Sequence, residues 1–193
     1  MSVQQNSFFC VFIIMKPDFT HLVNACSKSD SDAQRQLYEM FAPNMLALCM
    51  NYTGSKSDAE DVLHDGFVRI FEKIHTLRNP ELLPAWVKQI MKNCAISYVS
   101  KKRKKGLLLI DEVADADDEL WCDDELAYRN FDKDDIFEAI QQLPEAYKVV
   151  FIMREIDGCD FEEISRTVKA PQTTVRSLLC RSKKKIKQYL LKI

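Results

Sequence analysis

Residues that break regular structure are scarce in this chain of 193 residues, which contains only 4 glycines and 6 prolines. An all-β fold needs many tight turns, and glycine and proline are the residues that such turns use most. The scarcity therefore argues against an all-β protein. It also excludes a glycine-rich phosphate loop, because neither GxGxxG nor GxxxxGK occurs in the sequence.

Paired cysteines and clustered histidines are absent as well. The 7 cysteines are scattered and contain no CxxC pair, so we expect reduced thiols in a cytoplasmic protein, without a disulfide framework or a zinc site. His21, His64 and His75 lie apart and have no companions at ligand spacing. No Ser-His-Asp or Cys-His arrangement can be defended. We therefore expect no metal, no cofactor and no enzymatic activity.

No apolar run is long enough to cross a bilayer. The run from Phe8 to Met15 is short, and no Lys or Arg precedes it. It lacks the basic start of a signal peptide and the length of a membrane span, so we expect no membrane insertion. Met1 and Met15 are both candidate start codons. We expect residues 1–17 to be an extension that is either disordered or untranslated.

Charge is present in quantity but is unevenly distributed. Apolar residues make up 47% of the chain and charged residues 29%, which is compatible with a packed core. The net charge is only -2, yet residues 165–193 contain Lys and Arg without any Asp or Glu, whereas acids dominate residues 111–145. This division predicts a polyanionic partner for the basic end.

Helical spacing of apolar residues predicts three helices in the first half of the chain. The first helical face consists of Leu37, Phe41, Met45, Leu48 and Tyr52. The second consists of Leu63, Phe67, Ile70 and Ile74. The third, which begins near Pro84, consists of Trp86, Ile90, Cys94 and Tyr98. We expect Trp86 to lie in the core.

Breaks and caps separate these helices. Gly54 and Ser55 end the first helix, and a capping box of Ser57 and Glu60 opens the second. Arg78-Asn79-Pro80 interrupts the pattern before the third helix. Residues 106–132 are rich in acids and poor in periodicity, which predicts a flexible acidic linker.

A second helical unit begins near Asp134. Its apolar positions are Ile136, Ile140, Leu143, Val149, Val150, Met153, Ile164 and Val168, followed by Val175, Leu178, Leu179, Ile186 and Leu190. Pro144 is expected in a first helical turn, Asp160 at a cap, and Lys169-Ala170-Pro171 at a turn before a long basic helix. A short helix, a turn and a basic helix are typical of a helix-turn-helix, although many αα-hairpins look similar.

Three sequence motifs resemble those of extracytoplasmic-function sigma factors. Residues 58–69, DAEDVLHDGFVR, resemble the family's "DAEDLVQEVFLR", and residues 85–93, AWVKQIMKN, resemble "AWLYRIARN". Leu143-Pro144, Phe161 to Ser165 and Pro171 to Arg176 resemble "LP…YEEIA…P-GTVKSRL". The motifs occur in the family's order and at its intervals, from about residue 18 to residue 187.

The resemblance implies an all-α protein of two small helical domains. Residues 18–105 would bind core RNA polymerase and melt the promoter -10 element, residues 106–132 would be the linker, and residues 133–193 would read the -35 element. The resemblance also implies an alternative sigma factor without enzymatic activity, whose partners are core polymerase, promoter DNA and an anti-sigma factor. A stand-alone helix-turn-helix regulator is the alternative interpretation.

The resemblance assigns candidate residues to each surface. The core-polymerase surface consists of Glu60, Asp61, Asp65 and Arg69, on a helix that in the family contacts an arginine-bearing coiled coil of the largest subunit. For the -10 element the candidates are Arg78, Asn79, Lys88, Lys92 and Asn93. For the -35 element they are Thr174, Arg176, Ser177, Cys180, Arg181 and Lys184.

The acidic face could also be an ordinary solvated helix face, and the basic end of the last helix a solvated tail. Arg176 and Arg181 are expected to face the groove, and Lys183, Lys184 and Lys187 to lie toward the DNA backbone. The chain departs from the family at Lys169 and Thr173, where glycines are frequent. A lysine at a left-handed turn position is strained. Gly66, inside a helix, costs about 1 kcal/mol against alanine.

Overall fold

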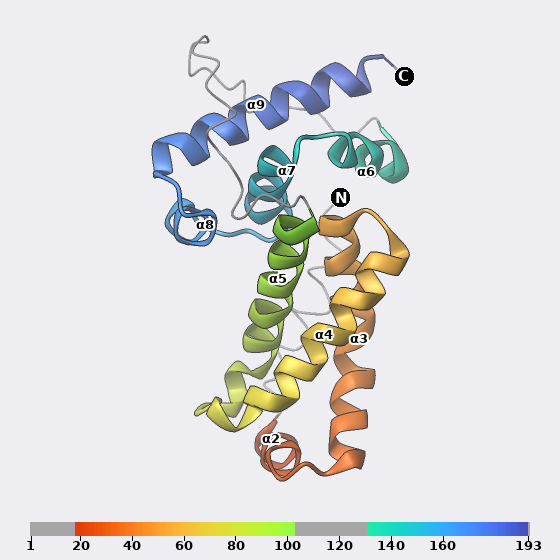
Figure 1. Ribbon diagram of the computed structural model, residues 1–193, viewed down its shortest axis with the longest axis vertical. Helices are drawn as coiled ribbons and strands as arrows, with labels where there is room; N and C mark the ends of the chain where they lie inside the picture. The colour runs from red at the N-terminus through yellow and green to blue at the C-terminus, as the bar shows by residue number, and fades with distance from the viewer. Residues whose placement is uncertain (1–17, 103–130, 193) are drawn as a thin grey trace. The chain divides into compact units, whose positions relative to one another are not determined.

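The computed structural model describes residues 18–102 and 131–192, and every regular element within these residues is helical (Figure 1). The prediction of an all-α fold is therefore confirmed. The first elements are α2 (Thr20–Ser27), α3 (Ser31–Thr53), α4 (Lys56–Lys73), η1 (Ile74–Thr76), η2 (Pro80–Leu82) and α5 (Leu83–Lys102). The later ones are α6 (Lys133–Gln141), α7 (Glu145–Phe151), the π-helical η5 (Ile152–Ile156), α8 (Phe161–Val168) and α9 (Gln172–Leu190).

The chain divides into two compact units, of which one ends at Tyr98 and the other begins at Val99. The expected extension, residues 1–17, and nearly all of the expected linker, residues 106–132, lie outside the described residues.

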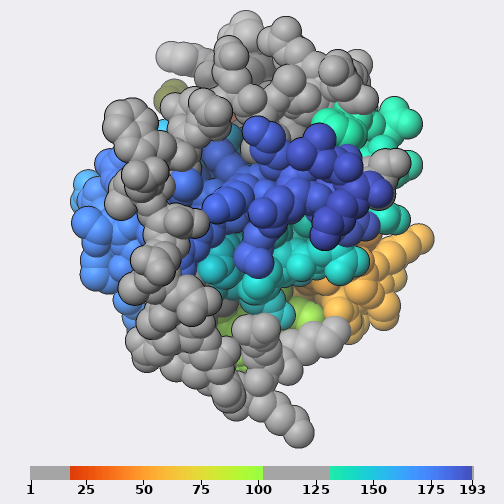
Figure 2. Space-filling model, turned by 90° about the horizontal axis from the view of Figure 1, so that it is seen from above, coloured from red at the N-terminus to blue at the C-terminus, as the bar shows by residue number. Residues whose placement is uncertain are grey.

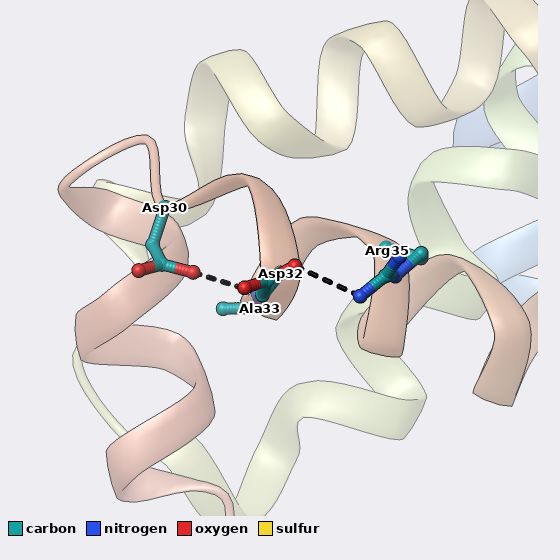
Figure 3. Close-up of polar contacts among 4 residues, drawn as sticks. All are labelled: Asp30, Asp32, Ala33 and Arg35. Atoms are coloured by element: carbon teal, nitrogen blue, oxygen red, sulfur yellow. Dashed lines mark hydrogen bonds and ion pairs between the residues drawn. The ribbon is translucent and has the colours of Figure 1, made fainter.

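Helix α3 begins earlier than its apolar spacing indicates. It starts at Ser31, because the Asp30 carboxylate accepts a hydrogen bond from the Ala33 amide at 2.8 Å (Figure 3). Arg35 forms an ion pair with Asp32 at 2.8 Å within the first turn. The predicted apolar face from Leu37 onward is buried as expected. The sequence Asp-Ser-Asp at 30–32 is a start signal that the apolar periodicity does not contain.

The cap of α4 is Ser55, so the predicted capping box of Ser57 and Glu60 is wrong. The Ser55 hydroxyl accepts from the Asp58 amide at 3.5 Å, and its backbone is extended (φ -131, ψ 134), as an N-cap requires. Ser57 is already helical. Gly54 supplies the left-handed turn between α3 and α4, with φ 71.

Helix α5 packs through a different face from the one predicted. Its buried residues include Leu83, Val87, Met91 and Ala95; of the predicted row, Cys94 is buried as expected. Trp86 and Ile90 are only half-buried, so the placement of Trp86 in the core is wrong. The predicted row and the row from Leu83 to Ala95 both advance in steps of four residues, so helical spacing alone cannot decide which of them faces the core.

Gly66 allows α4 and α5 to approach closely. Gly66 is buried, and a methyl group at this position would come within 2.6 Å of the Met91 Cε and closer still to its Sδ. The glycine therefore weakens α4 locally but makes room for a core methionine.

The second unit packs α9 against α6, α7 and α8. The predicted apolar face of α9 is buried. The Asp160 carboxylate caps α8 by accepting from the Glu163 amide at 2.7 Å. Lys169 has the left-handed conformation expected of it (φ 54, ψ 44). Pro144 precedes the first turn of α7 as its N-cap instead of lying within it.

Candidate functional site

One side of α4 is polar and exposed. Glu60, Asp61, Asp65 and Arg69 all lie on it, and the opposite side, which includes Val62 and Phe67, is buried. The structure therefore brings the four predicted core-polymerase residues together on one helix face. Glu60 also forms a long ion pair with Lys56, at 3.9 Å.

Contacts with α5 hold this helix in place. The Tyr98 hydroxyl donates to the Asp58 carboxylate at 2.9 Å, which joins the start of α4 to the far end of α5. Burial raises the pKa of the Cys94 thiol on α5, the Arg69 charge and hydrogen bond lower it, and the Asp65 charge raises it. The Arg69 and Asp65 charges are therefore near the Cys94 thiol of α5.

The candidate -10 residues lie on the η1–η2 segment and on α5. Arg78 and Asn79 are exposed. The Asn79 side-chain oxygen accepts from the Glu81 amide at 3.0 Å, which caps η2 and fixes the orientation of the side chain. Asn93 is exposed, and its side-chain oxygen accepts from Gln89 at 3.3 Å. Both amides thus have their oxygens engaged, and their NH₂ groups are the parts available to an acceptor.

Lys92 does not belong to the exposed part of this set. Only 4% of Lys92 is accessible to solvent, whereas Lys88, one turn earlier, is half-buried. The expectation that both lysines contact phosphates is therefore corrected for Lys92. The four-residue spacing suggested a common face, but Lys92 follows Met91 on the buried side of α5.

Helix α9 presents a polar face opposite its buried stripe, and Figure 2 shows its side chains exposed beside those of α7. Arg176 and Lys184 are exposed, and Thr174, Ser177 and Arg181 are half-buried. The structure brings these predicted -35 residues onto one helix, and Arg176 lies near its start.

The Arg176 side chain contacts an aromatic ring. Its Cζ lies 4.0 Å from the centroid of the Phe161 ring, at the start of α8. Arg154 of η5 lies over the same ring, with its Cζ 4.6 Å from the centroid. Among the described residues, Arg176 makes no ion pair with a carboxylate. Its N–H groups are thus available to an acceptor outside the protein.

Two predictions on α9 need correction. Lys183 forms an ion pair with Glu155 at 3.1 Å, and only 16% of its side chain is exposed, so it joins α9 to η5 instead of extending toward a DNA backbone. The second correction concerns Cys180, which is disulfide-bonded, whereas Cys26, Cys49, Cys94 and Cys159 are free thiols. The Cys180 sulfur therefore has no hydrogen to donate, and the expectation of reduced thiols is wrong at that position.

Sequence reasoning did not predict the contacts of three supporting residues, Phe161, Met91 and Tyr98. Phe161 opens the Phe-Glu-Glu-Ile motif, but nothing in this motif indicates a contact with Arg176. Met91 and Tyr98 act on α4 across the helix interface, at separations of 25 and 40 residues from their partners Gly66 and Asp58. No local pattern in the sequence indicates such pairs.

Comparison with known proteins assigns both units. Residues 37–105 match the family model described as sigma-70 region 2, and residues 133–186 match the one described as sigma-70, region 4. The chain is 28% identical over 145 residues to the RNA polymerase sigma factor SigV of Bacillus subtilis, covering 75% of this chain and 83% of that protein. It is 26% identical over 173 residues to the ECF RNA polymerase sigma-E factor of Escherichia coli, covering 86% and 90%.

A solved structure has the same fold. It is the sigma factor RpoE of Bartonella quintana in complex with the anti-sigma factor NepR, with a TM-score of 0.54 and 18% sequence identity. The match covers 81% of this chain and 95% of that chain. Within the described residues, no helix is both long and apolar enough to span a membrane.

Together the two matched regions, the polar faces of α4 and α9 and the sequence relatives define the class of protein. The chain belongs to the sigma-70 family of RNA polymerase sigma factors, which are non-catalytic initiation factors. More particularly, it is an alternative sigma factor of the extracytoplasmic-function group, which binds core RNA polymerase and directs promoter recognition and transcription initiation.

Proposed function

We propose that three exposed surfaces divide the work of initiation. The acidic face of α4 (Glu60, Asp61, Asp65 and Arg69) binds an arginine-bearing element of core polymerase, because carboxylates on one rigid helix suit bidentate guanidinium partners. The η1–η2 segment and α5 hold the melted -10 strand through Arg78, Asn79, Lys88 and Asn93. Helix α9 contacts the -35 element through Thr174, Arg176, Ser177, Arg181 and Lys184.

The corresponding domains are residues 18–105 and 133–193, joined by a linker at 106–132. The matched ranges of the two family models support this division.

The observation that supports this proposal most strongly is the exposure of Arg176 together with the contacts that its side chain makes. Arg176 is exposed near the start of α9, and it has no carboxylate partner among the described residues. An arginine placed in this way can form two hydrogen bonds to the O6 and N7 atoms of a guanine in the major groove. We assign Arg176 to base reading and Lys184, which is exposed two turns later, to phosphate contact.

Selection from a promoter library with a randomised -35 element tests this assignment. Holoenzyme carrying Arg176→Ala should select an altered -35 sequence, with a loss of about 1–3 kcal/mol at one position. Lys184→Ala is the matched control, because a lost phosphate contact weakens all sequences alike and lowers the salt slope by about one unit. Selection of the wild-type sequence by Arg176→Ala, at uniformly lower yield, would mean that Arg176 contacts only phosphate.

We also propose that the protein acts in the cytoplasm, where polymerase and chromosomal DNA are, and that an anti-sigma factor controls it. Both the α4 face and the α9 face are exposed in the chain by itself, and binding surfaces of this kind need to be covered when initiation is unwanted. The solved RpoE structure of similar fold contains such a partner. Affinity purification from cells under several stresses should recover a protein other than polymerase subunits, and recovery of polymerase alone would count against this regulation.

A further inference from the structure

Three elements of the second unit meet at the Phe161 ring. Phe161 is the first residue of α8, Arg176 belongs to α9 and Arg154 to η5. The two guanidinium carbons lie 4.0 and 4.6 Å from the ring centroid, inside the range of about 6 Å over which cations are attracted to an aromatic face. All three side chains are accessible to solvent, because none of them is buried.

The ring is held by the turn that precedes it. Arg154 Nη1 donates to the backbone oxygen of Cys159 at 2.9 Å, so the same side chain that lies over the ring also fixes the turn leading to it. Gly158 has the left-handed conformation that this turn requires (φ 72), and Asp160 caps the start of α8. The position of Phe161 is therefore determined before any DNA binds.

Neighbouring carboxylates do not compete with the ring for Arg176. Glu155 pairs with Lys183 at 3.1 Å, and Glu162 pairs with Arg166 at 3.5 Å. The interaction that the structure records for Arg176 within its described part is the contact with the Phe161 ring. The Phe161 ring lies 4.0 Å from the central carbon of the guanidinium and is not a carboxylate, so this contact does not neutralise the group, whose planar N–H donors can still bind a bidentate acceptor.

We propose that Phe161 is a positioning residue for promoter recognition: its ring orients the Arg176 guanidinium for contact with one -35 base pair. This inference rests on the proposed role of Arg176. The ring restricts the rotamers of the Arg176 side chain before DNA binds, so less side-chain entropy is lost on binding. It does so without neutralising the guanidinium charge. An acidic partner would also orient the arginine but would occupy its donors.

Equilibrium binding and library selection by holoenzyme test this inference together. The variants are Phe161→Leu, which removes the ring, Phe161→Tyr, which keeps it, Arg176→Ala, and the double variant Phe161→Leu with Arg176→Ala. Phe161→Met is made in parallel, so that the result does not depend on one variant folding, and thermal melting monitors the fold of each. The probe is a promoter duplex carrying the -35 sequence that the wild-type holoenzyme selects.

Phe161→Leu should weaken binding to this duplex about three- to tenfold, the range expected for loss of a partly exposed cation–π contact. It should also relax selection at the same -35 position as Arg176→Ala does. Phe161→Tyr should bind within about twofold of wild type, because the ring face is retained. In the Arg176→Ala background, Phe161→Leu should have almost no further effect, because its action passes through the arginine.

The matched control is Arg166→Ala. It removes a positive charge from the same helix, α8, but this residue pairs with Glu162 and not with the ring. We expect weaker binding at most, with the -35 preference unchanged.

Two results would overturn the inference while leaving the proposed function intact. One is a Phe161→Leu variant that retains wild-type affinity and preference although Arg176→Ala loses them. The other is an equal loss from Phe161→Leu in the wild-type and Arg176→Ala backgrounds, which would mean that the ring acts independently of the arginine. If Arg176→Ala itself keeps the wild-type preference, the base-reading role of Arg176 and the positioning role of Phe161 are both wrong.

Discussion

Gly66 is the single residue at which helix propensity and packing disagree most. Propensity alone predicts that Gly66→Ala stabilises α4 by about 1 kcal/mol. The added methyl group, however, would collide with Met91, which is completely buried. Because the colliding atoms are the flexible end of a side chain, we expect the clash to cancel or slightly exceed the gain.

A double-mutant cycle measured by urea unfolding separates these two effects. Gly66→Ala should leave the free energy of unfolding unchanged or lower it by about 1 kcal/mol in the wild-type background. In a Met91→Ala background, where space is available, the same change should raise it by about 1 kcal/mol. Equal stabilisation in both backgrounds would show that Met91 does not constrain position 66.

The buried thiol of Cys49 should make the free energy of unfolding fall at alkaline pH. Burial, which is the largest cause, raises the pKa of the Cys49 thiol to about 12, and the thiol is completely inaccessible to solvent. In the unfolded chain the thiol has an ordinary pKa and loses its proton at lower pH. The folded state then holds one more proton than the unfolded state, so stability is intact below about pH 9 and falls as the pH rises toward 12.

The corresponding measurement is the free energy of unfolding from pH 7 to pH 10.5. Its decline above pH 9 should be less steep in Cys49→Ala by about 1 kcal/mol per pH unit, the slope that one linked proton contributes. Some decline should remain, because burial also raises the pKa of Cys94. Identical slopes in the two proteins would contradict the assignment to Cys49.

At the scale of the element, the start of α4 depends on one serine. Ser55→Ala should lower the free energy of unfolding by about 1 kcal/mol, because it removes the acceptor for the Asp58 amide. Ser57→Ala is the matched control: Ser57 is exposed and helical, and we expect its change to stay within about 0.5 kcal/mol. A larger loss from Ser57→Ala would restore the capping box that the sequence pattern suggested.

The acidic face of α4 should be needed for polymerase binding and not for folding. Asp61→Arg with Asp65→Arg should weaken association with core polymerase about 10- to 100-fold, because it turns attraction toward arginines into repulsion. Both residues are exposed, so helical content should not change. The measurement is competition with another sigma factor for core polymerase.

The control for this double variant is Asp134→Arg with Glu138→Arg on α6. It has the same spacing and the same change of charge, and both positions are exposed. It separates loss of a particular contact from a general effect of added positive charge. Equal weakening by the two double variants would argue against a specific role for the α4 face.

The buried face of a helix could be predicted from the sequence where a single apolar row defines that face. For α3, α4 and α9 that face is a clear apolar row, and the predicted residues from Leu37, Leu63 and Val175 onward are buried. Apolar residues surround more of α5, so the pattern indicated Trp86 and Ile90, whereas Val87 and Met91 form the core. The choice between these rows is made by the helices that pack on α5, through contacts such as that of Met91 with Gly66.

The candidate surfaces could be predicted only as sets of residues. Helical spacing was sufficient to place Asp61 with Asp65 and to place Arg176 on an exposed face. It could not show that Lys183 is paired with Glu155 or that Phe161 lies beneath Arg176, because these contacts join residues from different elements. Which charges remain available to a partner is therefore a tertiary property.

At the scale of the whole molecule, the distribution of charge agrees with initiation by a two-unit factor. The basic C-terminal stretch contains α9, which suits a DNA partner, and exposed carboxylates lie on α4 of the other unit, which suits an arginine-bearing protein partner. The net charge of -2 hides this separation. The DNA contacts should therefore respond strongly to salt, although the chain as a whole is nearly neutral.

Transcription reconstituted from purified components tests the central claim most directly. Core RNA polymerase from the organism that encodes the chain is incubated with genomic DNA, with and without the full-length protein, and the 5′ ends of the transcripts are mapped. We predict a set of start sites that depends on the added chain, shares a common -35 and -10 sequence, and disappears with Asp61→Arg/Asp65→Arg. Start sites identical to those of core polymerase alone would contradict the assignment of this chain as a sigma factor.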